Sequence, residues 1–302
     1  MIISASRRTD VPAFYSDWFM NQIRKGKFLR KNPYNGNILE TNVEDVKCIV
    51  FWTRNANQIL KKEYLKELND LGIPYYFQYT ITGYKKELEK RTLHPLKAID
   101  NINTLADSIG GNKIIWRFDP IVISQYTPVE EIIRLYGKIG DNIHDDINEN
   151  VISFLDDYKK TGANLKLAGV ESQDLLNMSE ELNQVLNGIS ENAKRNNLNV
   201  TTCAENINLE KYGIKKGKCI DGDFIQKQLG VKVSKAKDQG QRKECGRIKS
   251  VDIGLYDTCI HGCEYCYATQ AQNLANQNYK KHDPENPFII PDERFNINNR
   301  II

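Results

Sequence analysis

Three cysteines lie close together in the stretch YDTCIHGCEYCYAT, which runs from Tyr256 to Thr269. They are Cys259, Cys263 and Cys266, spaced C-x3-C-x2-C, in a chain of 302 residues that contains seven cysteines. Thiolates at short spacings of this kind hold iron–sulfur clusters, and a four-iron cluster normally takes four of them. Three thiolates would leave one iron without a protein ligand, and an open metal position can bind a substrate or cofactor, as it does at catalytic zinc.

Zinc is the alternative metal for these cysteines. Structural zinc sites usually combine one closely spaced cysteine pair with a second pair further along the chain. Cys263 and Cys266 would form the first pair, and Cys259, Cys245 or His261 would complete the set. The same residues therefore leave two kinds of metal centre open, an iron–sulfur cluster and a structural zinc ion.

The other four cysteines fall outside this stretch. Cys48 lies within an apolar run, where we expect a buried thiol that packs as a small hydrophobic side chain. Cys203, Cys219 and Cys245 adjoin or bracket a segment of weak periodicity, and a second metal or cluster bound to them would keep that segment ordered. Two alternatives stand beside this second site. The three thiols are buried separately, or Cys245 is a fourth ligand that closes the main cluster.

The elements that must position these cysteines are strands and helices in alternation. Apolar, β-branched and aromatic runs predict strands at residues 2–6, 48–52, 75–81, 113–118, 151–155 and 199–204, with a last one at 251–256. Amphipathic runs between them predict helices. This alternation implies parallel strands with right-handed crossovers, and the nearly continuous apolar strands imply a sheet covered on both faces. Both a doubly wound sheet and a (βα) barrel satisfy the pattern.

The chain divides into three regions of a single domain. Its length of 302 residues is one that single α/β barrels often reach. Residues 1–205 contain six strand–helix units and form the predicted core. Residues 206–250 are rich in Lys, Gly and Gln, and we expect an irregular excursion that covers the mouth of the core. Residues 251–302 supply the last strand, the cysteine loop and a C-terminal helix.

Polar residues follow the predicted strands. Among them are Arg7, Arg8, Asp10, Arg54, Arg117, Asp119, Asp156, Asp157 and Glu205. The carboxyl ends of parallel strands meet at one side of the sheet, where ligands bind in barrels and open sheets alike. Guanidinium groups there suit a carboxylate or phosphate, so we expect the rim to bind a cofactor or an anionic substrate. Its candidate residues are Arg7, Arg8, Arg54, Arg117, Asp119 and Glu205. The alternative is a network of structural salt bridges.

The composition narrows the class of protein. No stretch approaches the roughly 20 apolar residues of a membrane span, and the N-terminus has no basic region followed by an apolar run. We therefore expect a cytoplasmic protein without membrane contact, in which thiols stay reduced and clustered cysteines indicate metal or catalysis. The formal net charge of +3 is too small to indicate a nucleic-acid partner by itself.

The segment CIHGCEYC resembles the cluster-binding loop of the radical S-adenosylmethionine superfamily. The resemblance implies a 4Fe–4S cluster on Cys259, Cys263 and Cys266, with S-adenosylmethionine on the fourth iron and Tyr265 near the adenine. It also implies a TIM-like full or partial (βα) barrel, and an electron donor such as a flavodoxin or ferredoxin. One departure is that the loop of the superfamily usually follows the first strand, whereas here it follows the last predicted one.

The rest of the chain resembles the domain-of-unknown-function 1848 family. The matching segments are, in order, MIISASRRTDVPAFYSDWF, VFWTRN, WRFDPI, ISFLDDY, CAEN, CIDG and DIGLYDTCIHGCEYCYA. That family is described as uncharacterised or as related to spore photoproduct lyase. Its members often read C-x-C where this chain has Cys245, Gly246 and Arg247, so the arginine removes one candidate ligand here.

The resemblance predicts an enzyme in which reduction of the cluster cleaves S-adenosylmethionine, and the resulting 5′-deoxyadenosyl radical takes a hydrogen atom from a substrate. The alternative function is that of a binding protein stabilised by iron–sulfur or zinc, which would contact nucleic acid through the arginine rim without radical chemistry. The substrate is not predicted by the sequence.

Overall fold

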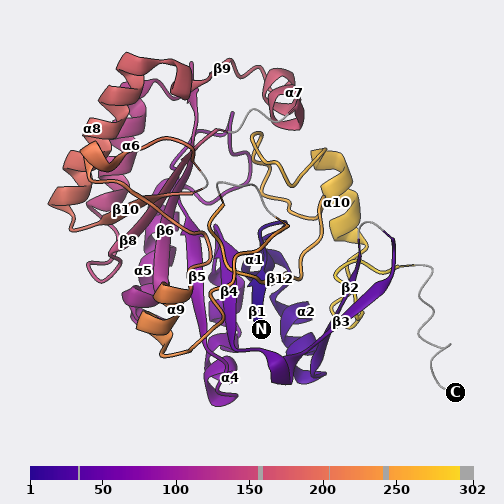
Figure 1. Cartoon of the computed structure of the whole chain (residues 1–302). Coiled ribbons are helices and arrows are strands. Elements are labelled where there is room, and N and C mark those ends of the chain that lie inside the picture. Colours follow the sequence, from indigo (N-terminus) through magenta and orange to yellow (C-terminus); the bar gives the residue numbers. More distant parts are fainter. Residues whose placement is uncertain (33–34, 156–158, 204, 241–244, 293–302) are drawn as a thin grey trace, which may run out of the picture.

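An eight-stranded parallel sheet forms the centre of the protein in the computed structural model, which describes residues 1–32, 35–155, 159–203, 205–240 and 245–292 (Figure 1). The strands lie in the order β11-β10-β8-β6-β5-β4-β1-β12. In chain order they are β1 (Ile2–Ala5), β4 (Cys48–Thr53), β5 (Tyr75–Thr80), β6 (Ile114–Ile121), β8 (Glu149–Phe154), β10 (Asn199–Thr202), β11 (Lys215–Lys216) and β12 (Val251–Asp252). The prediction of a parallel α/β fold is confirmed.

The strands follow the order of the chain across most of the sheet. From β1 to β11 they succeed one another in chain order, and β12 returns to pair with the free side of β1. A full or partial barrel was expected, and a closed barrel is not found among the described strands, because β11 and β12 remain the two edges. Both edge strands are two residues long and offer few backbone groups for closing the ring.

Helices follow most of the strands. They are α1 (Val11–Phe14), α2 (Ser16–Arg24), α3 (Asn57–Lys61), α4 (Tyr64–Asp70), α5 (Pro95–Ile109), α6 (Val129–Gly140), α7 (Lys159–Leu167), α8 (Ser179–Arg195), α9 (Gly222–Leu229) and α10 (Gln272–Lys280). Two small antiparallel pairs, β2 (Lys27–Lys31) with β3 (Ile38–Asn42) and β7 (Ile123–Ser124) with β9 (Ser172–Gln173), were not predicted. In the part of the chain that the structure describes, no helix has both the length and the apolar character needed to span a membrane.

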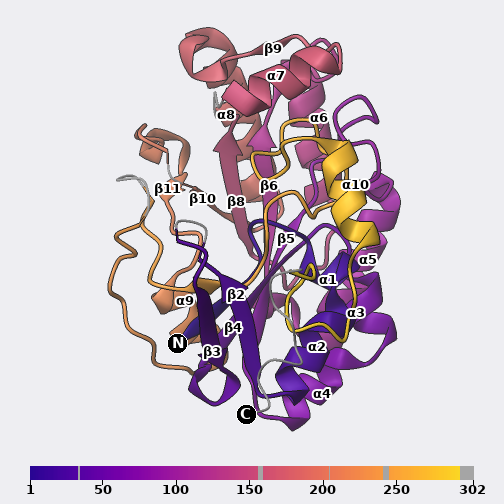
Figure 2. The same cartoon turned by 90° about the vertical axis from the view of Figure 1, so that its right-hand side faces the viewer.

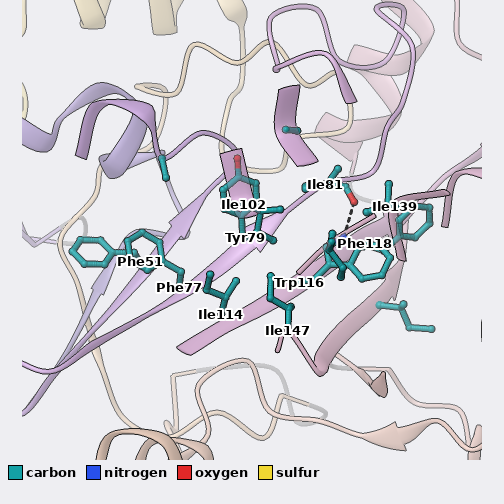
Figure 3. Packing of buried hydrophobic residues seen from close by; sticks show 14 of the residues in the cluster. Phe51, Phe77, Tyr79, Ile81, Ile102, Ile114, Trp116, Phe118, Ile139 and Ile147 are labelled. Atoms are coloured by element: carbon teal, nitrogen blue, oxygen red, sulfur yellow. Dashed lines mark hydrogen bonds between the residues drawn. The ribbon is translucent and has the colours of Figure 1, made fainter. Parts of the chain in front are cut away.

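The large hydrophobic core lies between one face of the sheet and the helices. Phe51 and Phe77 stack on neighbouring strands with ring centroids 4.8 Å apart, and Trp116 and Phe118 continue the aromatic row along β6 (Figure 3). The buried indole N–H of Trp116 donates to the carbonyl of Ile81 at 3.0 Å, so its polar group is satisfied. This face is therefore fully occupied and leaves no room for a ligand.

The opposite face of the sheet changes character along its length. Its N-terminal half is apolar, and the 206–250 excursion packs against it on the side away from α2 and α5 (Figure 2). There the ring of Phe224 in α9 lies 5.0 Å from that of Tyr76, and Cys48 is fully buried as expected. The excursion was predicted to cover the mouth as an irregular segment. It contains the helix α9, whose apolar side chains pack against the N-terminal half of this face of the sheet.

The C-terminal half of that face is polar. Side chains point to the same face of a strand at every second residue, so Ile2 is followed there by Ser4 and Ser6, and Ile115 by Arg117 and Asp119. Apolar residues thus cover this face at the N-terminal ends of the strands, and polar residues line a space at their C-terminal ends.

We expect the aromatic row to dominate stability. The change Phe77→Ala removes a fully buried ring from the central strand β5 and should lower the free energy of unfolding by about 3–5 kcal/mol. Leu71→Ala is the matched control, because Leu71 is 54% exposed and its loss should cost less than about 0.5 kcal/mol. Urea denaturation of the two variants measures both values, and equal losses would contradict this account of the core.

Candidate metal centre

A cavity of about 1760 Å³ opens at the carboxyl ends of the strands. It is lined by all three loop cysteines, Cys259, Cys263 and Cys266, and by all three of the second set, Cys203, Cys219 and Cys245. Of the predicted rim residues, Arg7, Arg8, Arg54, Arg117, Asp119 and Tyr265 also line it. Its volume exceeds the roughly 300–1,000 Å³ of ordinary ligand pockets, so there is space for more than one bound group.

One described rim residue does not line the cavity. The carboxylate of Glu205 accepts a hydrogen bond from the backbone N–H of Phe154 at 3.0 Å, and Glu205 is not among the described residues that line the cavity. Asp156 and Asp157 lie outside the described residues. The predicted rim residues that do line the cavity come from the ends of β1, β4 and β6.

The cysteine loop is fastened to the segment that follows β5. The backbone N–H of Glu264 donates to the carbonyl of Leu88 at 3.0 Å, and that of Arg91 donates to the carbonyl of His261 at 2.8 Å. Between the first two cysteines, Gly262 turns the chain with φ of 73°, a left-handed conformation that side-chain-bearing residues rarely adopt. These contacts and this turn define the path of the loop that carries the three cysteines.

Asp10 joins the loop to the first two strands of the sheet. Its carboxylate is buried and lies 2.7 Å from Nε2 of His261 in the loop. The same carboxylate accepts from the backbone N–H of Ala13, which caps α1, and from the hydroxyl of Thr53 and the backbone N–H of Arg54 at the end of β4. His261 thus connects the loop to the first two strands through Asp10.

A second buried carboxylate, Glu89, lies next to Cys263 and accepts several hydrogen bonds. It forms an ion pair with Arg54 at 2.9 Å and accepts hydrogen bonds from the hydroxyls of Tyr265 and Thr82. The guanidinium of Arg54 also donates to the Tyr265 hydroxyl at 2.6 Å. Arg54 and Tyr265, both predicted to bind cofactor or substrate, are thus engaged with each other and with Glu89.

Asp252 fixes the junction between β1 and β12. It accepts from the hydroxyls of Ser4 at 3.0 Å and Ser6 at 2.6 Å, and it pairs with the guanidinium of Arg7 at 3.5 Å. The approach is so close that a Cβ on Gly254 would lie 2.0 Å from the Ser6 hydroxyl, which only glycine avoids. The predicted strand 251–256 ends at Asp252 because its carboxylate then accepts from the backbone N–H of Gly254 and turns the chain.

Arg117, another of the predicted rim arginines, also lines the cavity. Arg117 is buried and pairs with Asp119, and it also donates to the side-chain carbonyl of Gln78 at 3.0 Å. The alternative prediction for the rim, a network of structural salt bridges, therefore holds for Arg7, Arg54 and Arg117. Arg8 differs, because in the described chain it has no ion pair and lies over the ring of Tyr256 at 4.9 Å.

The loop thiols are close enough to influence one another electrically. Burial raises the pKa of Cys259 to about 12, and the neighbouring Cys266 adds to that effect. Burial also raises the pKa of Cys263 well above its usual range, while the positive charge of Arg54 acts in the opposite direction. A metal bound at Cys259 and Cys263 would therefore have to displace the protons of these two thiols.

The second set of thiols forms a group at the cavity. The sulfurs of Cys219 and Cys245 are 4.0 Å apart. The neighbouring thiol of Cys219 and the charge of Arg117 lower the pKa of Cys203, although burial acts against them. Cys245 thus contacts Cys219, and its role as a fourth ligand of the loop cluster stays a prediction.

Sequence reasoning missed Glu89, Asp252 and Arg30, which also lines the cavity. The rim was predicted from polar residues that directly follow a predicted strand. Glu89 and Arg30 do not follow one, and Asp252 lies inside one, so this pattern did not identify them. Within the described chain, no three His, Cys, Asp or Glu side chains already surround the position of a single metal ion. An iron–sulfur cluster is larger than an ion and requires its sulfurs to stand further apart.

The fold and the site define an α/β protein in which a parallel sheet carries a cysteine-lined cavity. The model of a domain of unknown function, DUF1848, matches residues 2–268, and the chain belongs to that family. Neither a curated protein nor a solved structure matches the chain.

The two thiol groups should differ in reactivity when the protein is free of metal. We expect the alkylation rate of Cys203 to level off at a lower pH than that of an ordinary thiol, whose pKa is about 8.5, because its thiolate is stabilised. The rate at Cys259 should still rise above about pH 10, since its pKa is about 12. Iodoacetamide labelling followed by peptide mass spectrometry measures both profiles. Access to the cavity does not change the shape of either profile, so coincident curves would contradict the assignment.

Proposed function

We propose that the protein is an iron–sulfur enzyme of the radical S-adenosylmethionine type, with a 4Fe–4S cluster on Cys259, Cys263 and Cys266. The observation that carries the proposal is that all three thiols line one large cavity at the carboxyl ends of a parallel sheet. A reduced cluster with bound S-adenosylmethionine supplies a 5′-deoxyadenosyl radical, which takes a hydrogen atom from a substrate. The chain itself binds, orients and shields these groups.

The strand order supports the proposal at the point where the sequence departs from the superfamily. The cysteine loop follows β12, which lies beside β1 in the sheet. A loop after β12 therefore opens next to the end of the first strand, close to where a loop after β1 would open. The cyclic order of the strands likewise agrees with a partial (βα) barrel whose ring is open between β11 and β12.

The residues around the loop have distinct tasks in this proposal. Asp10 and His261 hold the loop in place, and Glu89 fixes Arg54 beside Cys263. The positive charge of Arg54 favours the thiolate over the thiol, and so assists the loss of the proton that cluster binding requires. Hydrogen bonds to the segment after β5 hold the loop that carries the three sulfur ligands.

An anionic substrate group fits two arginines that form no ion pair in the described part of the protein. Arg8 and Arg30 both line the cavity, and Nε of Arg30 is buried without a hydrogen-bond partner. Burial lowers the pKa of Arg30, and the repulsion from the positive charge of Arg8 adds to this effect, while the negative charge of Asp252 acts against it. A carboxylate or phosphate between them would relieve that repulsion and complete their hydrogen bonds.

The cluster itself is tested by anaerobic reconstitution. We expect a brown protein with about four iron and four sulfide per chain, whose reduced electron paramagnetic resonance signal changes when S-adenosylmethionine is added. Cys263→Ala should lose the cluster, whereas Cys48→Ala should retain it, because Cys48 is buried in β4 outside the cavity. A colourless protein that binds only zinc would end the proposal. A cluster that never responds to S-adenosylmethionine would favour a metal-stabilised binding protein instead.

The arginine pair is tested with inorganic phosphate as the probe. Arg8→Gln and Arg30→Gln should each weaken phosphate binding about tenfold, the effect of losing a charge-assisted hydrogen bond worth about 1.5 kcal/mol. Arg24→Gln is the control, because Arg24 pairs with Glu67 and does not line the cavity. Isothermal titration calorimetry measures the affinities. Unchanged affinity in both cavity variants would remove the arginines from the binding site.

A further inference from the structure

Three distant segments bring the second group of thiols together. Cys203 directly follows β10, Cys219 follows β11, and Cys245 precedes β12 by several residues. The sulfurs lie near one another, since Cys219 lies 4.0 Å from Cys245, its thiol lowers the pKa of Cys203, and all three residues line the same cavity. In a chain with so few cysteines, unrelated buried thiols are not expected to lie this close together.

The backbone around these thiols is held by specific contacts. The amide of Gln78 donates to the carbonyl of Cys219 at 2.9 Å, which ties the excursion to the centre of the sheet. The backbone N–H of Ile248 donates to the carbonyl of Ile220 at 3.2 Å and aligns the segments that carry Cys219 and Cys245. A Cβ on Gly217 would lie 2.7 Å from the hydroxyl of Thr201, so the excursion approaches β10 as closely as glycine allows.

We propose that Cys203, Cys219 and Cys245 form a second metal centre for a thiophilic metal, separate from the cysteine loop and facing the same cavity. Thiolates select zinc or iron–sulfur clusters over hard cations. The 4.0 Å between Cys219 and Cys245 is close to the about 3.8 Å that separates two sulfurs bonded at 2.3 Å to a tetrahedral zinc ion. Among the described residues no three ligand side chains already surround one metal position, so Cys203 would have to move to join the same tetrahedron.

The charges around the group suit bound thiolates. Each thiol that binds a divalent metal loses its proton to solvent, and three thiolates with one such ion carry a net charge of −1. Arg117 interacts with Cys203, and its guanidinium is buried at the same wall of the cavity. Arg247 is 4% exposed and pairs with Asp238 at 2.6 Å, while its other terminal nitrogen is buried without a hydrogen-bond partner. Each guanidinium is already paired with a carboxylate, Asp119 or Asp238, and the unpartnered Arg247 nitrogen is a donor for a bound thiolate.

The centre also has a structural task that follows from its three segments. The 206–250 excursion has little regular structure beyond α9, and a metal would cross-link its two ends to β10. The inference goes beyond the proposed function and does not depend on it, because it concerns thiols that the cysteine loop does not contain.

The test uses the full-length chain with the loop ligands removed by Cys259→Ala, Cys263→Ala and Cys266→Ala. After anaerobic reconstitution with zinc, or with iron and sulfide, this variant should still bind metal. Adding Cys203→Ala, Cys219→Ala and Cys245→Ala should reduce the bound metal at least tenfold, whereas adding Cys48→Ala should not. Metal analysis gives the stoichiometry, and colour with sulfide content distinguishes a cluster from zinc. Either metal supports the proposal, and a folded loop variant that binds neither overturns it.

Differential alkylation of the unaltered chain covers the case in which the variants do not fold. Bound metal should protect Cys203, Cys219 and Cys245 from N-ethylmaleimide at least tenfold, as measured by peptide mass spectrometry before and after chelation. Equal labelling in both states would overturn the proposal, and so would a disulfide between Cys219 and Cys245 in the protein as purified. Loss of the response to S-adenosylmethionine is a separate readout, so the two proposals fail independently.

Discussion

The carboxylate of Asp10 is the point on which the geometry of the cavity depends. It caps α1, accepts two hydrogen bonds at the end of β4 and meets His261 in the cysteine loop at 2.7 Å. A buried carboxylate is costly unless hydrogen bonds or a charge compensate it, and here every partner comes from an element that borders the cavity. The beginning of the chain thus fixes the position of cysteines some 250 residues further on.

The sheet gives this network its setting. Because the strands follow one another in chain order, their crossover helices gather on one face and build the aromatic core there. The other face is free to be used in two ways. Its N-terminal half packs against α9, and its C-terminal half presents serines, arginines and thiols to the cavity. A closed barrel would fill the same space with side chains from all its strands.

The sequence was sufficient to predict the parallel strands and the side of the sheet at which the arginines and cysteines gather, because apolar runs and strand ends are local patterns. It could not predict which partners the arginines find. Arg54 meets Glu89, and Arg7 meets Asp252, through contacts that only the folded chain creates. The β2–β3 hairpin was missed for another reason: its strands are half exposed and rich in charged residues, and so lack an apolar run.

The pairing of β1 with β12 also constrains the biosynthesis of the protein. Ser4 finds its neighbour Asp252 only after the intervening chain has been made, which at 5–20 residues per second takes on the order of ten seconds or more. During that interval β1 can pair with β4 while its other edge stays open to foreign strands. The cysteine loop emerges later still, so the aromatic core can assemble on the ribosome before the cavity is complete.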